Sequence, residues 1–184
     1  MEKYLNDTVK TIQELIRIDS TNQPAEEGMP FGKGAARALQ AFLSCAAAMG
    51  FETRNYAILA HLDVVPAGSG WTHAPFGGEI ENGKLYGRGA MDDKGPAVVC
   101  LYALKALKDE GFQPRKTIKL IVGCNEECGW GCIDHYKQCA EMPKVGFTPD
   151  ADFPVIYAEK GILHVKFYFP VENAPFTALY GGKG

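Results

Sequence analysis

The sequence predicts an α/β fold, a three-layer αβα sandwich with a mainly parallel central sheet. Segments with helical periodicity alternate along the chain with short β-prone runs, an order typical of parallel strands that are joined by helices. The run TIKLIVGC at residues 117–124 is continuous and β-prone. Such a run is typical of a strand that is covered by helices on both faces of a sheet.

Four helices are expected, at about residues 5–16, 35–49, 96–109 and 129–139. The first has apolar side chains at the spacing of one helical face, formed by Leu5, Val9, Ile12 and Ile16. The second is expected to end at Gly50 and to turn four side chains inward, those of Leu39, Phe42, Leu43 and Ala46.

Strands are expected at residues 51–55, 56–65, 117–124 and 162–169, and a small hairpin is expected around Asn82 and Gly83. The first two strands follow each other without a clear turn, although neighbouring strands need a turn or a crossover. Segments absent near Asn55 and Pro170 would explain this, and a bent continuous strand is the alternative.

Length and composition describe one globular domain, with 184 residues, 46% hydrophobic residues and a net charge of -3. This charge gives no reason to expect a nucleic-acid partner. The apolar stretches are far shorter than the ~20 residues of a membrane span, and the acidic, helix-like N-terminus is no signal peptide. A cytoplasmic protein without membrane partners is therefore expected, and its oligomeric state stays open.

Three of the six cysteines, Cys124, Cys128 and Cys132, are spaced four residues apart. This spacing raises the alternative of an iron–sulfur or thiolate–zinc cluster, although such sites more often contain a C-x-x-C pair, which is absent here. The remaining cysteines are expected in the core or on the surface of helices. His73, His135 and His164 are expected to be surface residues.

Chemistry-bearing residues follow several of the predicted strands. In open α/β sheets, sites gather outside the carboxyl ends of the strands. An imidazole with several carboxylates at one sheet edge would repel strongly without cations, and this donor set suits zinc, with manganese or cobalt as alternatives. The residues concerned are His61, Asp63, Asp92, Asp93, Glu126, Glu127 and Asp150.

Four motifs in order, HLDVVPAGSGW, GRGAMDDKGP, NEECGWG and GFTPDADFPVIYAEKG, resemble those of the co-catalytic dinuclear zinc peptidases. This family includes bacterial dipeptidases, carnosinases, glutamate carboxypeptidase, aminoacylases and succinyl-diaminopimelate desuccinylase. The phrases GMPFGKG and TPDADFPVIYAEKG are most similar to the bacterial dipeptidase branch. The resemblance implies a hydrolase that cleaves the amide bond of dipeptides or short peptides.

The resemblance also implies a role for each metal ligand of a two-zinc site. His61 and Asp150 would bind one metal, Glu127 would bind the second, and Asp92 would bridge the two. Two such cations can activate a bridging water and polarise the scissile carbonyl.

Two further roles follow from the same resemblance. Asp63 would hold the imidazole of His61 and fix its tautomer. Glu126 would be the general base, taking a proton from the metal-bridging water and delivering it to the leaving amine. The family also implies a cis peptide bond between Asp92 and Asp93.

The sequence departs from this family in length. Residues 1–169 match the catalytic domain, and residues 170–184 form a tail where the family has a lid domain and its last metal-binding histidine. A chain that ended at Gly184 would bind metal weakly and hydrolyse dipeptides poorly. The alternatives are an N-acyl-amino-acid deacylase and a catalytically incomplete fragment that binds metal or a partner.

Overall fold

A computed structural model describes residues 2–52 and 59–152, together with positions 154, 156–158, 160, 161 and 165. The chain divides into two compact units, Met1–Ala151 and Asp152–Gly184, and the elements below belong to the first. The expected strand at 162–169 and the expected domain boundary after residue 169 lie outside the described residues, so both stay predictions.

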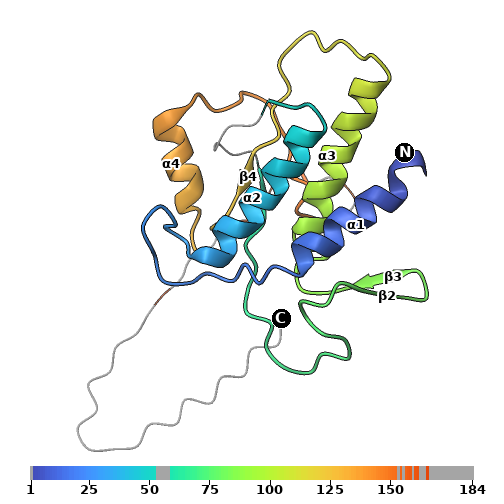
Figure 1. Ribbon diagram of the computed structural model, residues 1–184. Helices are drawn as coiled ribbons and strands as arrows, with labels where there is room; N and C mark the ends of the chain where they lie inside the picture. Colours follow the sequence, from blue (N-terminus) through green and yellow to red (C-terminus); the bar gives the residue numbers. More distant parts are fainter. Residues whose placement is uncertain are drawn as a thin grey trace, which may run out of the picture. The chain divides into compact units, whose positions relative to one another are not determined.

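The four expected helices are confirmed as α1 (Leu5–Ile16), α2 (Lys33–Ala48), α3 (Lys94–Asp109) and α4 (Gly131–Cys139), and a 3₁₀ turn, η1 (Glu2–Tyr4), precedes α1 (Figure 1). Gly50 has a φ of 74° just beyond α2, a conformation that glycine adopts without strain. Within the described residues, none of the helices has the length and apolarity of a membrane span.

The central strands β1 (Ala60–His61) and β4 (Val122–Gly123) pair in parallel, with Ala60 opposite Val122. This confirms the expected parallel pairing, but both strands are much shorter than the predicted runs 56–65 and 117–124. A ladder needs a partner along its whole length. Residues 53–58, which precede β1, lie outside the described part of the chain. Ile121 still accepts a hydrogen bond from Ala60 N–H at 3.1 Å, whereas residues 117–120 belong to no described strand.

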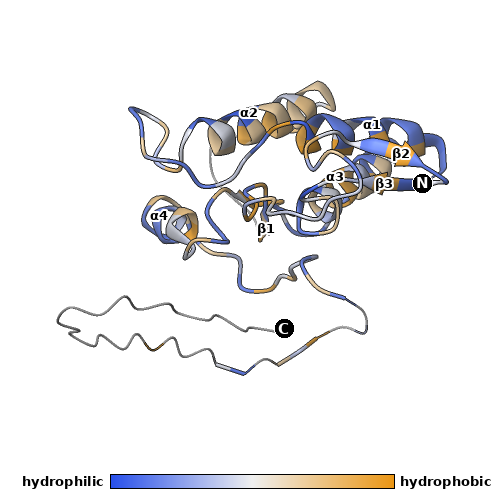
Figure 2. Ribbon diagram, turned by 90° about the horizontal axis from the view of Figure 1, so that it is seen from below, coloured by the Kyte–Doolittle hydropathy of each residue, from blue (hydrophilic) through white to orange (hydrophobic). Residues whose placement is uncertain are grey.

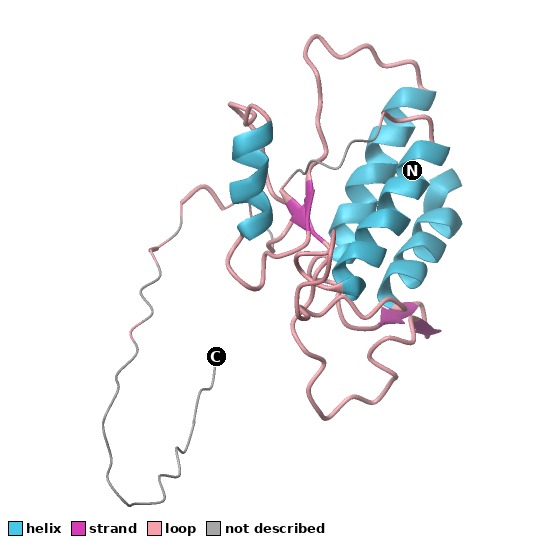
Figure 3. Ribbon diagram, turned by 60° about the vertical axis from the view of Figure 1, so that its left-hand side comes forward, coloured by secondary structure: helices cyan, strands magenta, loops and turns pink. Residues whose placement is uncertain are grey.

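Helices lie on both sides of this strand pair, as expected for an αβα sandwich. Helices α1, α2 and α3 lie side by side on one side of β1 and β4, and α4 lies on the other (Figure 3). Val122 packs into the core shared with α1, α2 and α3, whereas its neighbour Ile121 packs against Ile133 and Tyr136 of α4. Neighbouring strand residues point to opposite faces, so the strand is covered on both.

The buried face of α1 agrees with the predicted one at Ile12 and Ile16 but not at Leu5. Leu15 and Ile16 are almost fully buried, but Leu5 is 58% exposed, because Tyr4 of η1 occupies the core beside Tyr102 of α3 instead. Helix α1 mixes hydrophilic and hydrophobic residues, whereas α2 is hydrophobic along most of its length (Figure 2). In α2 the predicted inward residue Phe42 is buried.

The expected hairpin is formed by β2 (Glu79–Glu81) and β3 (Lys84–Tyr86), which pair antiparallel. Asn82 and Gly83 both have positive φ values, 51° and 74°, as a type I′ turn requires. The expectation that His73 is exposed is wrong, because its side chain is only 16% exposed. Its ring stacks on Tyr86 with centroids 3.8 Å apart, and its Nδ1 lies 2.9 Å from Glu79 Oε2.

Candidate metal centre

His61 is the buried centre of the candidate site. It ends β1, its side chain is 1% exposed, and its backbone N–H donates to Asp93 Oδ2 at 3.1 Å. Its Nδ1 lies 3.0 Å from the backbone carbonyl oxygen of Asp63. A carbonyl only accepts hydrogen bonds, so this contact places the proton on Nδ1 and leaves the lone pair of the neutral ring on Nε2.

The other sequence-predicted carboxylates surround His61 Nε2. Oxygens of Asp92, Asp150 and Glu126 lie 3.0, 3.4 and 3.9 Å from this atom. The atom is buried, and no described residue gives it a hydrogen bond of good geometry. A buried nitrogen that has no hydrogen bond and lies close to several carboxylates is suited to binding a cation.

Two sets of side chains could each hold a metal ion. One is His61 with Asp92 and Asp150, and the other is His61 with Glu126 and Glu127, and the ligand atoms within each set lie within 4.8 Å of one another. Glu127 is therefore grouped with His61, and the set around Asp92 does not include it. All five residues come together as the sequence predicts, and the roles assigned to them stay predictions.

The charges of the site shift the pKa of His61 strongly. Burial favours the neutral ring, but Asp63 and then Asp150 favour the imidazolium and raise the pKa of His61 to about 10. The pKa of Asp93 rises to about 7, mainly because burial disfavours its charged form. The site thus favours binding of a positive charge, whether a proton or a metal ion.

The pKa values of the remaining acids are also raised. Burial raises the pKa of Glu126, and Asp150 adds to the effect. Burial, followed by the charge of Asp92, also raises the pKa of Glu127 and of Asp150. A divalent cation among these carboxylates would offset both their repulsion and their loss of solvation.

A comparison with protein families decides the assignment. Residues 57–176 match the model of peptidase family M20/M25/M40. This chain belongs to that family.

Two curated relatives of this peptidase chain cover most of it. YtjP of Bacillus subtilis is 42% identical over 182 residues, which are 89% of this chain and 39% of that protein. Beta-Ala-Xaa dipeptidase of Lactobacillus delbrueckii subsp. lactis is 43% identical over 180 residues, or 88% of this chain and 38% of that protein. The M20-family chain thus spans about two fifths of the length of these relatives.

Solved structures confirm the predicted fold of this M20-family chain. Human carnosine dipeptidase 1 matches with a TM-score of 0.59 and 23% identity, over 73% of this chain and 35% of that chain. An M20 family metallo-carboxypeptidase from Sulfolobus solfataricus matches with a TM-score of 0.58 and 23% identity, over 72% and 34%. Both likenesses concern the fold alone.

Two residues that follow Asp92 in this M20-family chain contribute in ways that sequence reasoning missed. Asp93 occupies the N-cap position of α3, but its side chain makes no cap hydrogen bond and accepts one from the His61 backbone N–H instead. Lys94 is fully buried and donates to the carbonyl oxygens of Leu15 and Ile18. Burial lowers the pKa of Lys94 to about 8. The Asp92–Asp93 peptide bond is cis, as expected.

In the described part of the M20-family chain, the three evenly spaced cysteines are not grouped with one another as possible metal ligands. Cys124 is buried and donates to the carbonyl oxygen of Ala35, Cys128 is exposed, and Cys132 is half-buried. The possible ligand sets within the described residues contain no cysteine. Cys45, Cys100 and Cys139 lie in helices, as expected.

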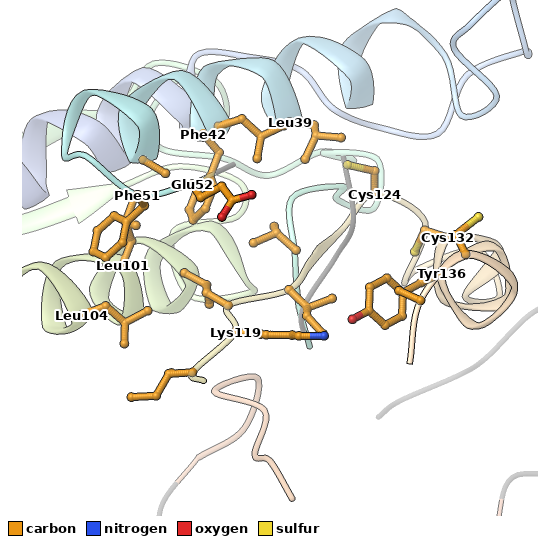
Figure 4. A pocket seen from close by; sticks show the side chains of 18 of the residues that line it. Leu39, Phe42, Phe51, Glu52, Leu101, Leu104, Lys119, Cys124, Cys132 and Tyr136 are labelled. Atoms are coloured by element: carbon orange, nitrogen blue, oxygen red, sulfur yellow. The ribbon is translucent and has the colours of Figure 1, made fainter. Parts of the chain in front are cut away.

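A cavity of about 1280 Å³ lies away from these carboxylates. It is lined by parts of α2, α3, β4 and α4, and Figure 4 shows Leu39, Phe42, Leu101 and Tyr136 among its mostly apolar walls. None of the site side chains, from His61 to Asp150, lines it. In this M20-family chain, the converging carboxylates therefore mark the candidate site, because this cavity contains none of them.

Proposed function

We propose that this chain forms the metal-binding catalytic part of a hydrolase that cleaves dipeptides or short peptides. The observation that carries the proposal is the buried His61 Nε2, which lies 3.0 Å from Asp92 and 3.4 Å from Asp150. Family membership gives this arrangement a chemical context, because residues 57–176 match a peptidase family.

The proposed metals are two zinc ions, with manganese or cobalt as alternatives. His61, Asp92 and Asp150 would hold one ion, and Asp92 would share the second with Glu127. The donor set supports this, since imidazole nitrogen and carboxylate oxygen are common zinc ligands. When bound, such ions make water more acidic and polarise the carbonyl that is attacked.

Within this proposal, Glu126 is the general base that transfers the proton of the attacking water. Its carboxylate lies 3.9 Å from His61 Nε2, at the side of the proposed ligand set, and is partly exposed to solvent. There it would take a proton from the attacking water and pass it to the leaving amine. Its raised pKa suits it to holding the proton between these two transfers.

A dipeptide is the preferred substrate class because one relative is a Beta-Ala-Xaa dipeptidase. An N-acyl-amino-acid deacylase would use the same groups on a similar amide, and the described residues do not favour it. A non-enzymatic metal-binding chain would keep the metal ligands but would give Glu126 no function.

A chimera tests the proposal. This chain replaces the matching 180 residues of the Lactobacillus dipeptidase, and zinc content and hydrolysis of β-alanyl dipeptides and N-acyl amino acids are measured. We expect zinc-dependent dipeptide hydrolysis that a chelator abolishes and zinc restores. A folded, zinc-loaded chimera that cleaves only N-acyl amino acids would identify a deacylase, and one that cleaves neither class would support the non-enzymatic alternative.

A further inference from the structure

The Asp63 carboxylate contacts two segments of the site at once. Its Oδ1 accepts a hydrogen bond from the backbone N–H of Glu126 at 3.1 Å, and its Oδ2 accepts one from that of Glu127 at 3.2 Å. The Asp63 side chain is 1% exposed. Hydrogen bonds to a buried, charged carboxylate are stronger than those between neutral groups.

Three further hydrogen bonds close the turn that contains Glu126 and Glu127 (the glutamate turn), but none of the three uses the N–H group of either glutamate. Gly129 N–H donates to the Glu126 carbonyl oxygen at 3.2 Å. Trp130 N–H donates to the Asn125 carbonyl oxygen at 2.8 Å, and Gly131 N–H donates to Asn125 Oδ1 at 3.0 Å. The N–H groups of Glu126 and Glu127 belong to no helix or strand. Both residues are half-buried. Without Asp63 their N–H groups would need other acceptors or water, because an N–H group that is unpaired and away from water is costly.

The contact of Asp63 with the imidazole is looser. Nδ1 of His61 lies 3.5 Å from Asp63 Oδ1 but 3.0 Å from the backbone carbonyl oxygen of Asp63. The main-chain carbonyl can therefore fix the tautomer of His61, and the two short contacts of the carboxylate are with the glutamate turn.

We propose that Asp63 is a positioning residue that fastens the Glu126–Glu127 turn to the end of β1 and so places both glutamate side chains beside His61. The inference relies on the proposed function only for what the two glutamates then do. Asp63 comes two residues after His61, so one short segment would set both the imidazole and the glutamate pair.

Asp93 offers a matched comparison, because it is also a fully buried aspartate that accepts a backbone N–H. Its Oδ2 binds the His61 amide at 3.1 Å, but its Oδ1 has no hydrogen-bond partner among the described residues. An asparagine can therefore replace Asp93 and keep its one acceptor in place. At Asp63 both oxygens accept, and an asparagine offers only one acceptor.

The test is backbone amide hydrogen exchange, measured by NMR on the metal-free 184-residue chain. In Asp63→Asn, we expect the amide of Glu126 or Glu127 to exchange about 10- to 100-fold faster, the effect of losing one charged hydrogen bond. In Asp93→Asn, the His61 amide should stay within about threefold of its parent rate. Amides of Ile12 and Leu101, in α1 and α3, report whether each variant is folded.

Unchanged exchange at both glutamate amides in a folded Asp63→Asn protein would overturn the proposal. If that variant does not fold, amide exchange in the parent chain provides the test. Protected amides at Glu126 and Glu127 support the fastening, and exchange at the rate of an open loop refutes it. No metal is present in this experiment, so its result stands whether or not the chain binds zinc.

Discussion

His61 Nε2 lies 3.0 Å from Asp92 Oδ1, and the two side chains differ sharply in exposure, at 1% for His61 and 62% for Asp92. The pair thus joins a buried nitrogen to a carboxylate that solvent reaches. A cation arriving from solvent would meet Asp92 first and would then be held by His61. Metal binding should depend strongly on His61, since it belongs to both possible ligand sets of the described residues.

Replacing His61 should therefore weaken zinc binding. Changes to residues that only support a ligand already reduce metal affinity by about 10–100-fold, so His61→Gln should reduce zinc affinity by at least that factor. Isothermal titration with zinc measures it. His135→Gln is the matched control, because His135 is an exposed histidine in α4 and its loss should leave zinc binding unchanged.

Glu126 and Glu127 are adjacent residues of the same type, but the proposed function gives them different roles, general base for Glu126 and metal ligand for Glu127. In the chimera, Glu126→Gln should keep zinc and lose about 10²–10⁴-fold in turnover, the usual contribution of a general acid–base group. Glu127→Gln should instead lose zinc, because it removes a ligand. Parallel zinc analysis and dipeptide assays distinguish the two, and full activity in Glu126→Gln would assign the base elsewhere.

In the metal-free chain, the contribution of His61 to stability should fall as pH rises from 6.5 to 10. The pKa of His61 rises from 6.5 to about 10 on folding, so in this range the folded state binds a proton that the unfolded state has released. Its contribution is fully present below pH 6.5 and is lost by about pH 10. Urea unfolding with a chelator present measures the effect.

His61→Gln isolates this contribution. Lys94 acts in the opposite direction, since its pKa is lowered from 10.5 to about 8 on folding, but this effect is present in both proteins and cancels in their difference. The parent chain should lose more stability than the variant between pH 6.5 and 10. Equal losses would show that the imidazole does not gain its proton on folding.

Gly95 allows the loop that precedes α3, which carries Asp92, to pack closely against this helix. A Cβ at this position would collide with the carbonyl oxygen of Ala90. Gly95→Ala should therefore destabilise the chain by about 1–3 kcal/mol, the usual cost of overpacking, despite the better helix propensity of alanine. Val99→Ala, at a position of α3 that is 46% exposed, should cost less. Denaturant midpoints compare them, and a more stable Gly95→Ala would contradict the observed packing.

The helices and the hairpin could be predicted because their signals are local. Helical periodicity identified α1 and α3, and the Asn82-Gly83 pair identified the turn between β2 and β3. Strand lengths could not be predicted, since a ladder depends on residues far away in sequence. The position of Leu5 was wrong for a similar reason, because the core position beside α3 is taken by Tyr4.

The site was predictable in part. Residue type and position next to the predicted strands and loops grouped His61, Asp92 and Asp150, whose ligand atoms the structure places within 4.8 Å of one another. The contacts of Asp93 and Lys94 were missed because both side chains bind backbone atoms, of His61, Leu15 and Ile18. Every residue has a backbone, so such contacts leave no pattern of residue types in the sequence.

The most direct test of the metal centre is anomalous diffraction at the zinc edge from crystals of the chain grown with zinc. The account predicts a zinc peak about 2.0–2.2 Å from His61 Nε2 and from carboxylate oxygens of Asp92 and Asp150. At saturating zinc, a peak at Cys124, Cys128 or Cys132 with none beside His61 would contradict it.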